Sequence, residues 1–161
     1  YPYLKRVTWA CHLLLGVSIG IAPIGGWIAV TGQFAGAPVL LWFAVAAWIA
    51  GFDMLYALLD VDSDREQGIH SVPVAYGLHG ALWGCRILHA AAVGALVLVG
   101  TLVGAGAIYF VGVAVCALIL LVENVAVRDG DPRAVQLAFG VANGVVAFTF
   151  FLFVLLEVVA R

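Results

Sequence analysis

Asp60 and Asp64 are the residues whose types and spacing best suit chemistry. They lie in the run Asp53–Ser71, which holds five of the nine acidic residues of the chain. If this run is helical, a rotation of about 100° per residue places both carboxylates on one face, one turn apart. Ionised carboxylates at that spacing repel each other and destabilise the helix unless a cation lies between them. The pair therefore predicts a cation site.

Mg²⁺ is the cation that best fits this pair. It takes oxygen ligands, uses one or two carboxylates, keeps several waters and often completes its shell with substrate phosphates. The same helical stripe carries Tyr56 and Asp53 beneath the pair, whereas Asp62 falls on the opposite side and Glu66 is expected at the surface. Gly68 is expected to end the helix. The alternative is a solvated acidic loop that binds nothing.

The substrate of such a site would have a phosphate head and an apolar tail, because the carboxylates border long apolar segments. Lys5 and Arg6 lie on the same inferred side of the membrane, where their charge would hold a diphosphate directly. Ordinary anchoring of the chain at the membrane surface explains these two basic residues equally well. Both interpretations remain open at the level of sequence.

Membrane helices must position these residues. The chain is 65% hydrophobic and 10% charged, with a mean hydropathy of +1.16, whereas about a quarter of the residues in soluble domains are charged. Residues 7–52, 87–122 and 134–156 contain no Asp, Glu, Lys or Arg, and a spanning helix needs about 20 apolar residues. We therefore predict an all-α, polytopic transmembrane helix bundle that forms one domain over residues 1–161. Its five spanning helices are expected at 9–30, 37–58, 79–102, 105–127 and 134–157.

The placement of the basic residues predicts the orientation. They precede the first span and flank the second and fourth links, whereas the links at 31–36 and 104–107 carry no charge. By the positive-inside rule, the N-terminal end, the acidic loop and the 128–133 loop face the cytoplasm. This pattern predicts a multi-pass protein of the inner (cytoplasmic) membrane, embedded in the lipid bilayer. No basic patch with interleaved aromatic residues suggests nucleic acid as a partner.

Small residues in the first span predict close helix packing. Gly16, Gly20, Gly25 and Gly26 allow neighbouring helices to approach, and Pro23 should kink the helix. The alternative is that these residues widen a cavity for function.

Three polar residues inside spans have two interpretations each. Glu123 and Asn124 are expected to snorkel to water as an interfacial pair, with contact to the hydroxyl or carboxylate of a substrate as the alternative. Asn143 must bond something, and a hydrogen bond to another helix is favoured over substrate contact.

The chain resembles the UbiA-type intramembrane prenyltransferases over nearly its whole length. The residues that carry the resemblance are Tyr1–Thr8, Gly20–Pro23, Trp27–Gly32, Gly51–Asp53, Tyr56, Asp60, Asp64, Gly68, Ser71, Phe139 and Asn143. The resemblance is greatest to bacterial 4-hydroxybenzoate polyprenyltransferases and to relatives that prenylate a dihydroxynaphthoate.

This resemblance implies an enzyme of ubiquinone or menaquinone biosynthesis. It would transfer a polyprenyl group from polyprenyl diphosphate to a hydroxylated aromatic acid, through Mg²⁺-assisted departure of diphosphate and attack of the ring on an allylic cation. Asp60 and Asp64 would bind the metal and act in catalysis with Tyr56. The residues implied to bind or line the substrates are Lys5, Arg6, Asp53 and Asn143.

The resemblance covers helices five to nine of a nine-helix bundle whose two Asp-rich motifs face each other. The first motif does not occur in these 161 residues. The expected partner is therefore the N-terminal half of the same enzyme, and the 161 residues alone are expected to be inactive.

Two readings from other classes compete with the enzyme. A membrane cation carrier or channel subunit would place acidic residues along its pathway, but the acids of this chain gather at one boundary. If the chain were a structural membrane subunit, the spacing of Asp60 and Asp64 would have no functional reason.

Overall fold

Five long helical segments make up the computed structural model, which describes residues 3–161. Tyr1 and Pro2, the first two residues of the N-terminal motif, lie outside the described range. The all-α prediction is confirmed, because each of the five segments is long and apolar enough to cross a membrane. They are Cys11–Thr31, Gly36–Glu66, Val72–Leu102, Ala107–Ala126 and Pro132–Val159.

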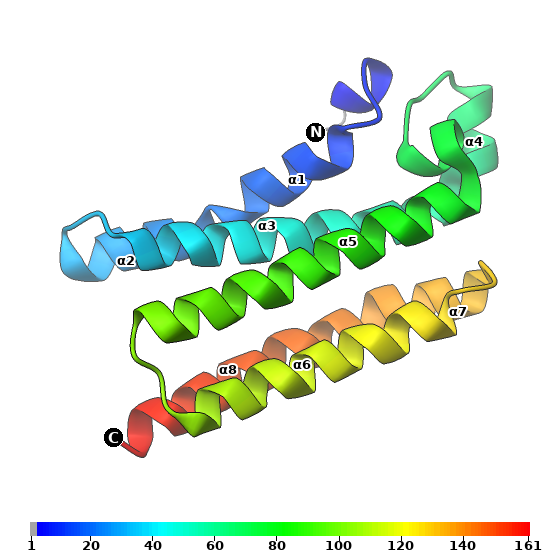
Figure 1. The fold of residues 1–161 in the computed structure, drawn as a ribbon. Helices are drawn as coiled ribbons and strands as arrows, with labels where there is room; N and C mark the ends of the chain where they lie inside the picture. The colour runs from blue at the N-terminus through cyan, green and yellow to red at the C-terminus, as the bar shows by residue number, and fades with distance from the viewer. Residues whose placement is uncertain (1–2) are drawn as a thin grey trace.

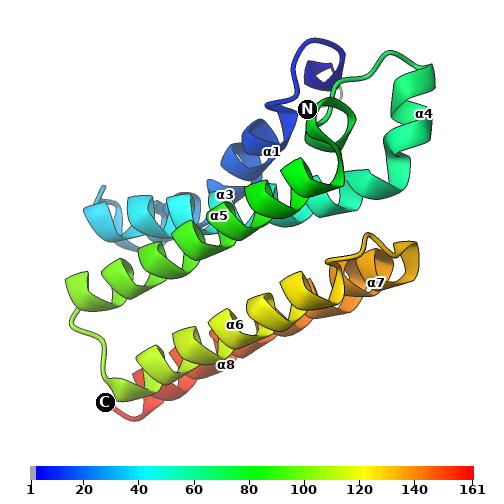
Figure 2. The ribbon, with the colours of Figure 1, turned by 45° about the vertical axis from the view of Figure 1, so that its right-hand side comes forward.

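The helices form two layers (Figure 1). One layer holds the first three spans and the other holds the last two, and Figure 2 shows the same division from a second direction. The elements of the first layer are α1 (Cys11–Gly20), α2 (Ala22–Thr31), α3 (Gly36–Tyr56) and α5 (Val72–Leu102). The second layer contains α6 (Ala107–Ala126), the short α7 (Pro132–Leu137), a π-helical turn (Ala138–Ala142) and α8 (Asn143–Val159).

The acidic segment α4 (Val61–Glu66), the N-terminal turn and the link between α6 and α7 lie at one end of the bundle (Figure 1). The links between α2 and α3 and between α5 and α6 lie at the other end, with the C-terminus. This is the grouping that the basic residues predicted. The loops with basic residues therefore share one end of the bundle.

The first span is broken at Ile21, which separates α1 from α2. Pro23 is the second residue of α2. Proline lacks the N–H that would continue the hydrogen bonding of α1, so a new helix starts here. The predicted kink is confirmed.

Glycines in α1 allow close contact with α3. A Cβ at Gly16 would overlap the carbonyl oxygen of Ala46, and a Cβ at Gly20 would lie 2.9 Å from the carbonyl oxygen of Trp42. Packing therefore explains these two glycines. A Cβ at Gly25 would meet no described atom within 4 Å, so close packing does not explain that glycine.

The third span begins at Val72, seven residues before the predicted start at 79. Ser71 caps the helix, because its Oγ accepts a hydrogen bond of 3.4 Å from the Val74 N–H. Gly77 then interrupts the helix with φ 68° and ψ −169°. The predicted start corresponds to the helix beyond this break, and the capped turn before it was missed.

Glu157 of α8 caps the N-terminus of α6 from a distance. Its Oε1 accepts hydrogen bonds from the Gly106 N–H (2.8 Å) and from Nε of Arg161 (2.9 Å), and its Oε2 accepts from the Tyr109 N–H at 3.3 Å. Gly106 is the N-cap residue and has no side chain to serve the free N–H groups of the first turn. The carboxylate from α8 supplies that cap and joins the two helices of the second layer.

We expect Glu157→Ala to lower the midpoint of thermal unfolding in detergent, because the first turn of α6 loses its acceptors. Glu157→Gln keeps one acceptor oxygen and should lose less. Tryptophan fluorescence during heating measures both. Equal midpoints for wild type and Glu157→Ala would contradict a capping role.

Candidate functional site

The acidic run leaves the axis of α3 through a short 3₁₀ turn. α3 ends at Tyr56, the turn covers Ala57–Asp60, and α4 then runs in a different direction (Figures 1 and 2). A 3₁₀ turn has about three residues per turn, so side chains after it no longer follow the stripe of the preceding α-helix. The segment Gly36–Glu66 stays helical, as the stripe requires, but the 3₁₀ turn interrupts the α-helical spacing on which the stripe was based.

Burial separates the acidic residues of this run. Asp64 is only 5% exposed, and its Oδ2 has no hydrogen-bond partner among the described residues. Asp60 is half-buried. The Asp62 side chain is 97% exposed and reaches only Arg65, at 3.7 Å, while Glu66 is also exposed. The surface positions expected for Asp62 and Glu66 are confirmed.

Gly68 ends α4, as predicted. Its φ of 64° lies in the left-handed region, which glycine adopts without strain. The Ile69 N–H donates to the Asp64 carbonyl (2.8 Å) and the Gly68 N–H donates to the Arg65 carbonyl (3.2 Å). These two bonds form a Schellman motif. The helix that carries Asp64 therefore ends in a hydrogen-bonded C-cap.

The N-terminal basic residues lie beside the end of the acidic loop. They belong to a short 3₁₀ turn, Leu4–Arg6. The His70 N–H donates a hydrogen bond of 2.6 Å to the carbonyl oxygen of Lys5. Segments more than 60 positions apart in the chain are therefore in contact, and Lys5 and Arg6 are held near the acidic loop.

His12 forms a buried contact that the sequence did not predict. Its side chain is fully buried, and Nδ1 lies 2.6 Å from Oδ2 of Asp53. Its Nε2 lies 3.2 Å from the backbone nitrogen of Val72. The available signal was a histidine inside a stretch, 7–52, with no Asp, Glu, Lys or Arg. Asp53 is predicted to line or support the site, and one of its oxygens bonds to His12.

A row of aromatic rings runs below the acidic segment, between α3 and the start of the last span. The ring of Tyr56 lies 4.1 Å from that of Phe139, Phe52 lies 5.5 Å from Phe139, and Trp48 lies 6.0 Å from Phe52. Trp48 Nε1 donates to Oδ1 of Asn143 at 3.0 Å. Asn143 thus makes the bond to another helix that was favoured for it.

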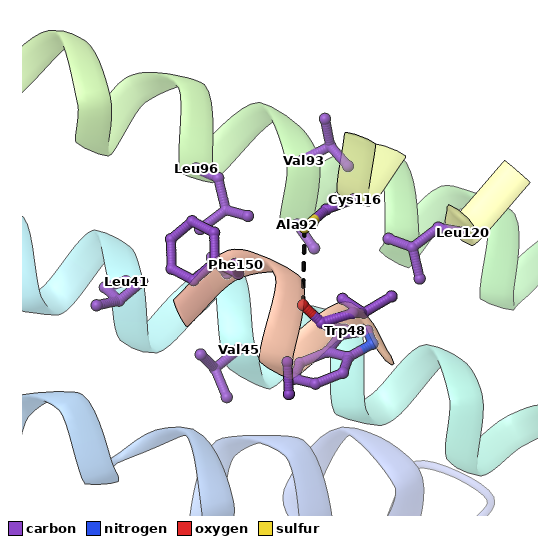
Figure 3. Close-up of a pocket in the computed structure, with 12 residues that line it drawn as sticks. Leu41, Val45, Trp48, Ala92, Val93, Leu96, Cys116, Leu120 and Phe150 are labelled. Atoms are coloured by element: carbon purple, nitrogen blue, oxygen red, sulfur yellow. Dashed lines mark hydrogen bonds between the residues drawn. The ribbon is translucent and has the colours of Figure 1, made fainter. Parts of the chain in front are cut away.

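An apolar cavity of about 70 Å³ lies beyond Trp48 (Figure 3). Helices α3, α5, α6 and α8 line it, and the lining residues include Val45, Leu96 and Phe150. On one side, Cys116 Sγ contacts the Val146 carbonyl at 3.7 Å. An apolar cavity of this kind suits hydrocarbon rather than water.

Glu123 and Asn124 are buried, so the prediction that they snorkel to water is wrong. They are 4% and 6% exposed. Asn124 Nδ2 lies 3.0 Å from Nδ1 of His89 and donates to the Leu120 carbonyl at 2.9 Å. Both Glu123 oxygens lack partners among the described residues. Packing of the C-terminal end of α6 against α5 turns these side chains inward, which hydropathy alone does not show.

The acidic segment fits a small hard cation held by few protein ligands. Within residues 3–161, no group of three or more His, Cys, Asp or Glu side chains is placed to hold a metal. Mg²⁺ does not need such a group, since it commonly uses one or two carboxylates and retains waters. The unpartnered Oδ2 of buried Asp64 and the nearby Asp60 supply donors of that type.

Comparison with known proteins gives a consistent result. The profile described as "UbiA prenyltransferase family" matches residues 1–156. The chain is 30% identical to a 4-hydroxybenzoate solanesyltransferase of Synechocystis over 134 residues, which cover 83% of this chain and 45% of that protein. It is 33% identical to a 4-hydroxybenzoate octaprenyltransferase of Xanthomonas campestris over 126 residues, which cover 76% of this chain and 40% of that protein.

A solved structure has the same arrangement of helices. The apo structure of a UbiA homolog from Aeropyrum pernix matches with a TM-score of 0.84 and 30% identity, covering 98% of this chain and 59% of that one. The chain spans a little under half the length of the curated relatives named above.

Proposed function

Because the chain belongs to the UbiA prenyltransferase family, we propose that its protein transfers a polyprenyl group from a polyprenyl diphosphate to a hydroxylated aromatic acid. The acceptor is 4-hydroxybenzoate or a dihydroxynaphthoate, on a route to ubiquinone or menaquinone. The names of the relatives support 4-hydroxybenzoate. The observation that carries the proposal is the hydrogen bond from the His70 N–H to the Lys5 carbonyl, which joins the basic N-terminal turn to the end of the run that contains buried Asp64.

The diphosphate of the donor binds at this end of the bundle. Asp60 and Asp64 would hold Mg²⁺, and Lys5 and Arg6 would bind phosphate oxygens. Mg²⁺ bound there would stabilise the negative charge on the departing diphosphate. The buried position of Asp64 keeps its carboxylate away from bulk water, which strengthens its attraction for a cation.

The aromatic row serves the prenyl end of the donor. Faces of Tyr56 and Phe139 present negative π density, which stabilises positive charge within about 6 Å of a ring centroid. They favour the allylic cation that forms when the C–O bond to diphosphate breaks. The acceptor ring then forms the new C–C bond and loses its ring proton.

The apolar cavity beyond Trp48 is in line with a donor that carries a hydrocarbon tail. The protein would act as a multi-pass protein of the inner membrane, with its acidic and basic loops facing the cytoplasm. A complete diphosphate site needs the other acidic motif that the family resemblance implies, the first of the two, which does not occur in these 161 residues. The decisive experiments therefore use the full natural protein.

We expect the full protein in proteoliposomes to prenylate 4-hydroxybenzoate or a dihydroxynaphthoate when supplied with a long polyprenyl diphosphate and Mg²⁺. Product is detected by chromatography and mass spectrometry, with EDTA as the metal-free control. Product from one acceptor identifies the substrate. No product from either acceptor, in a preparation shown to be folded, would refute the proposal.

A further inference from the structure

His12 connects three separate parts of the fold through one imidazole ring. It lies in the first turn of α1, while its two nitrogens contact Asp53 near the end of α3 and Val72 at the start of α5. Those contacts span 41 and 60 positions in sequence. The acidic loop lies between Asp53 and Val72, so both of its ends are fastened to the same side chain.

The directions of the two hydrogen bonds assign the tautomer of His12. A backbone N–H can only donate, so Nε2 must accept from Val72 and carries no proton. The ring proton is then on Nδ1, which donates to the Asp53 carboxylate at 2.6 Å. A buried ring with both nitrogens satisfied has one preferred orientation. His12 is therefore held in a defined position.

Backbone contacts extend this connection to the basic residues. The His70 N–H bonds to the Lys5 carbonyl, and the Cys11 Sγ lies 3.7 Å from the His70 carbonyl. The segment Leu4–His12 thus runs along the end of the acidic loop at residues 70–72. His12 therefore lies next to the contact between the basic turn and the end of the acidic loop.

We propose that His12 is a positioning residue, which sets the shape of the acidic loop and its distance from Lys5 and Arg6. It acts through its hydrogen bonds to Asp53 and Val72. The consequence for metal binding rests on the proposed prenyl transfer, whereas the effect on loop shape does not. The competing explanation is a buried histidine that contributes only to overall stability.

Hydrogen exchange followed by mass spectrometry separates these explanations in the full protein. In His12→Leu, peptides covering 57–72 should exchange at least about tenfold faster, because two anchoring hydrogen bonds are lost. Peptides covering 107–116, in the half of α6 that lies away from the acidic loop, should not change. His89→Leu is the matched control, since it removes a buried histidine that bonds Asn124 instead of the loop. Faster exchange throughout His12→Leu, or unchanged exchange in 57–72, would overturn the proposal.

His12→Gln provides the conservative variant, because its amide can donate and accept. It should restore slow exchange at least in part, and it remains informative if His12→Leu does not fold. Exchange in 57–72 of His12→Gln as fast as that of an unfolded segment would also overturn the proposal.

Kinetics test the consequence for the site. His12→Leu should raise the Mg²⁺ concentration needed for half-maximal transfer by about tenfold, with a smaller change in the maximal rate. An equal loss of maximal rate with an unchanged Mg²⁺ requirement would refute positioning of the metal ligands. If the wild type transfers no prenyl group but His12→Leu still loosens only the loop, the proposed function fails and the positioning role stands.

Discussion

The Asp64→Asn variant of the full natural protein is expected to transfer prenyl groups at least about 100-fold more slowly than the wild type, equivalent to ~2.7 kcal/mol of lost transition-state stabilisation. The substitution keeps the size of the side chain and removes the charge that attracts Mg²⁺. Because Asp64 is buried and its Oδ2 has no described partner, the loss should fall on metal binding rather than on the fold. Added Mg²⁺ should recover part of the rate.

Asp62→Asn is the matched control for this prediction. Asp62 lies in the same helix, carries the same charge and has a side chain that is 97% exposed. Its replacement should leave the rate within about twofold, since exposed ion pairs contribute little. Initial rates at several Mg²⁺ concentrations measure both variants. Equal rates for the Asp62 and Asp64 variants would show that the carboxylate pair does not hold the metal.

The membrane spans could be predicted because length and hydropathy determine them locally. A spanning helix is recognised by a run of about 20 apolar residues. The positions of the basic residues were enough to predict which loops lie at the same end of the bundle. A helix end that depends on a single residue type could also be predicted, as the left-handed conformation of Gly68 shows. The start of α5 could not be predicted in this way, because Ser71 and Gly77 shape a capped turn that precedes the apolar part of the span.

The sequence predicted which chemical groups belong to the candidate site, but not how they are arranged in space. Helical spacing selected Asp60 and Asp64, but the 3₁₀ turn Ala57–Asp60, which ends at the first of these residues, changes the direction of the chain without a clear sequence signal. The role of His12 depends on partners 41 and 60 positions away, which a single sequence does not reveal. Glu123 was misplaced for the same reason, since packing decides whether a polar side chain near a helix end faces water or protein.

Gly16→Leu is expected to destabilise the bundle more than any surface substitution. A Cβ at this position would overlap the Ala46 carbonyl oxygen of α3, and backbone cannot move aside as a flexible side chain can. Overpacking of a close interface costs about 1–3 kcal/mol, and more where backbone must shift. Gly16 also lies one helical turn after His12, so a wider gap between α1 and α3 should lengthen the contact between His12 and Asp53.

This prediction links helix packing to the site. Gly25→Leu is the control, because it places the same side chain in the same span where no described atom lies within 4 Å. We expect Gly16→Leu, and not Gly25→Leu, to lower the unfolding midpoint in detergent and to speed hydrogen exchange in 57–72. If Gly16→Leu destabilised the protein while exchange in the acidic loop stayed slow, the loop would be held independently of α1. The contacts of His12 with Asp53 and Val72 would then not couple the packing of the first span to the conformation of the acidic segment.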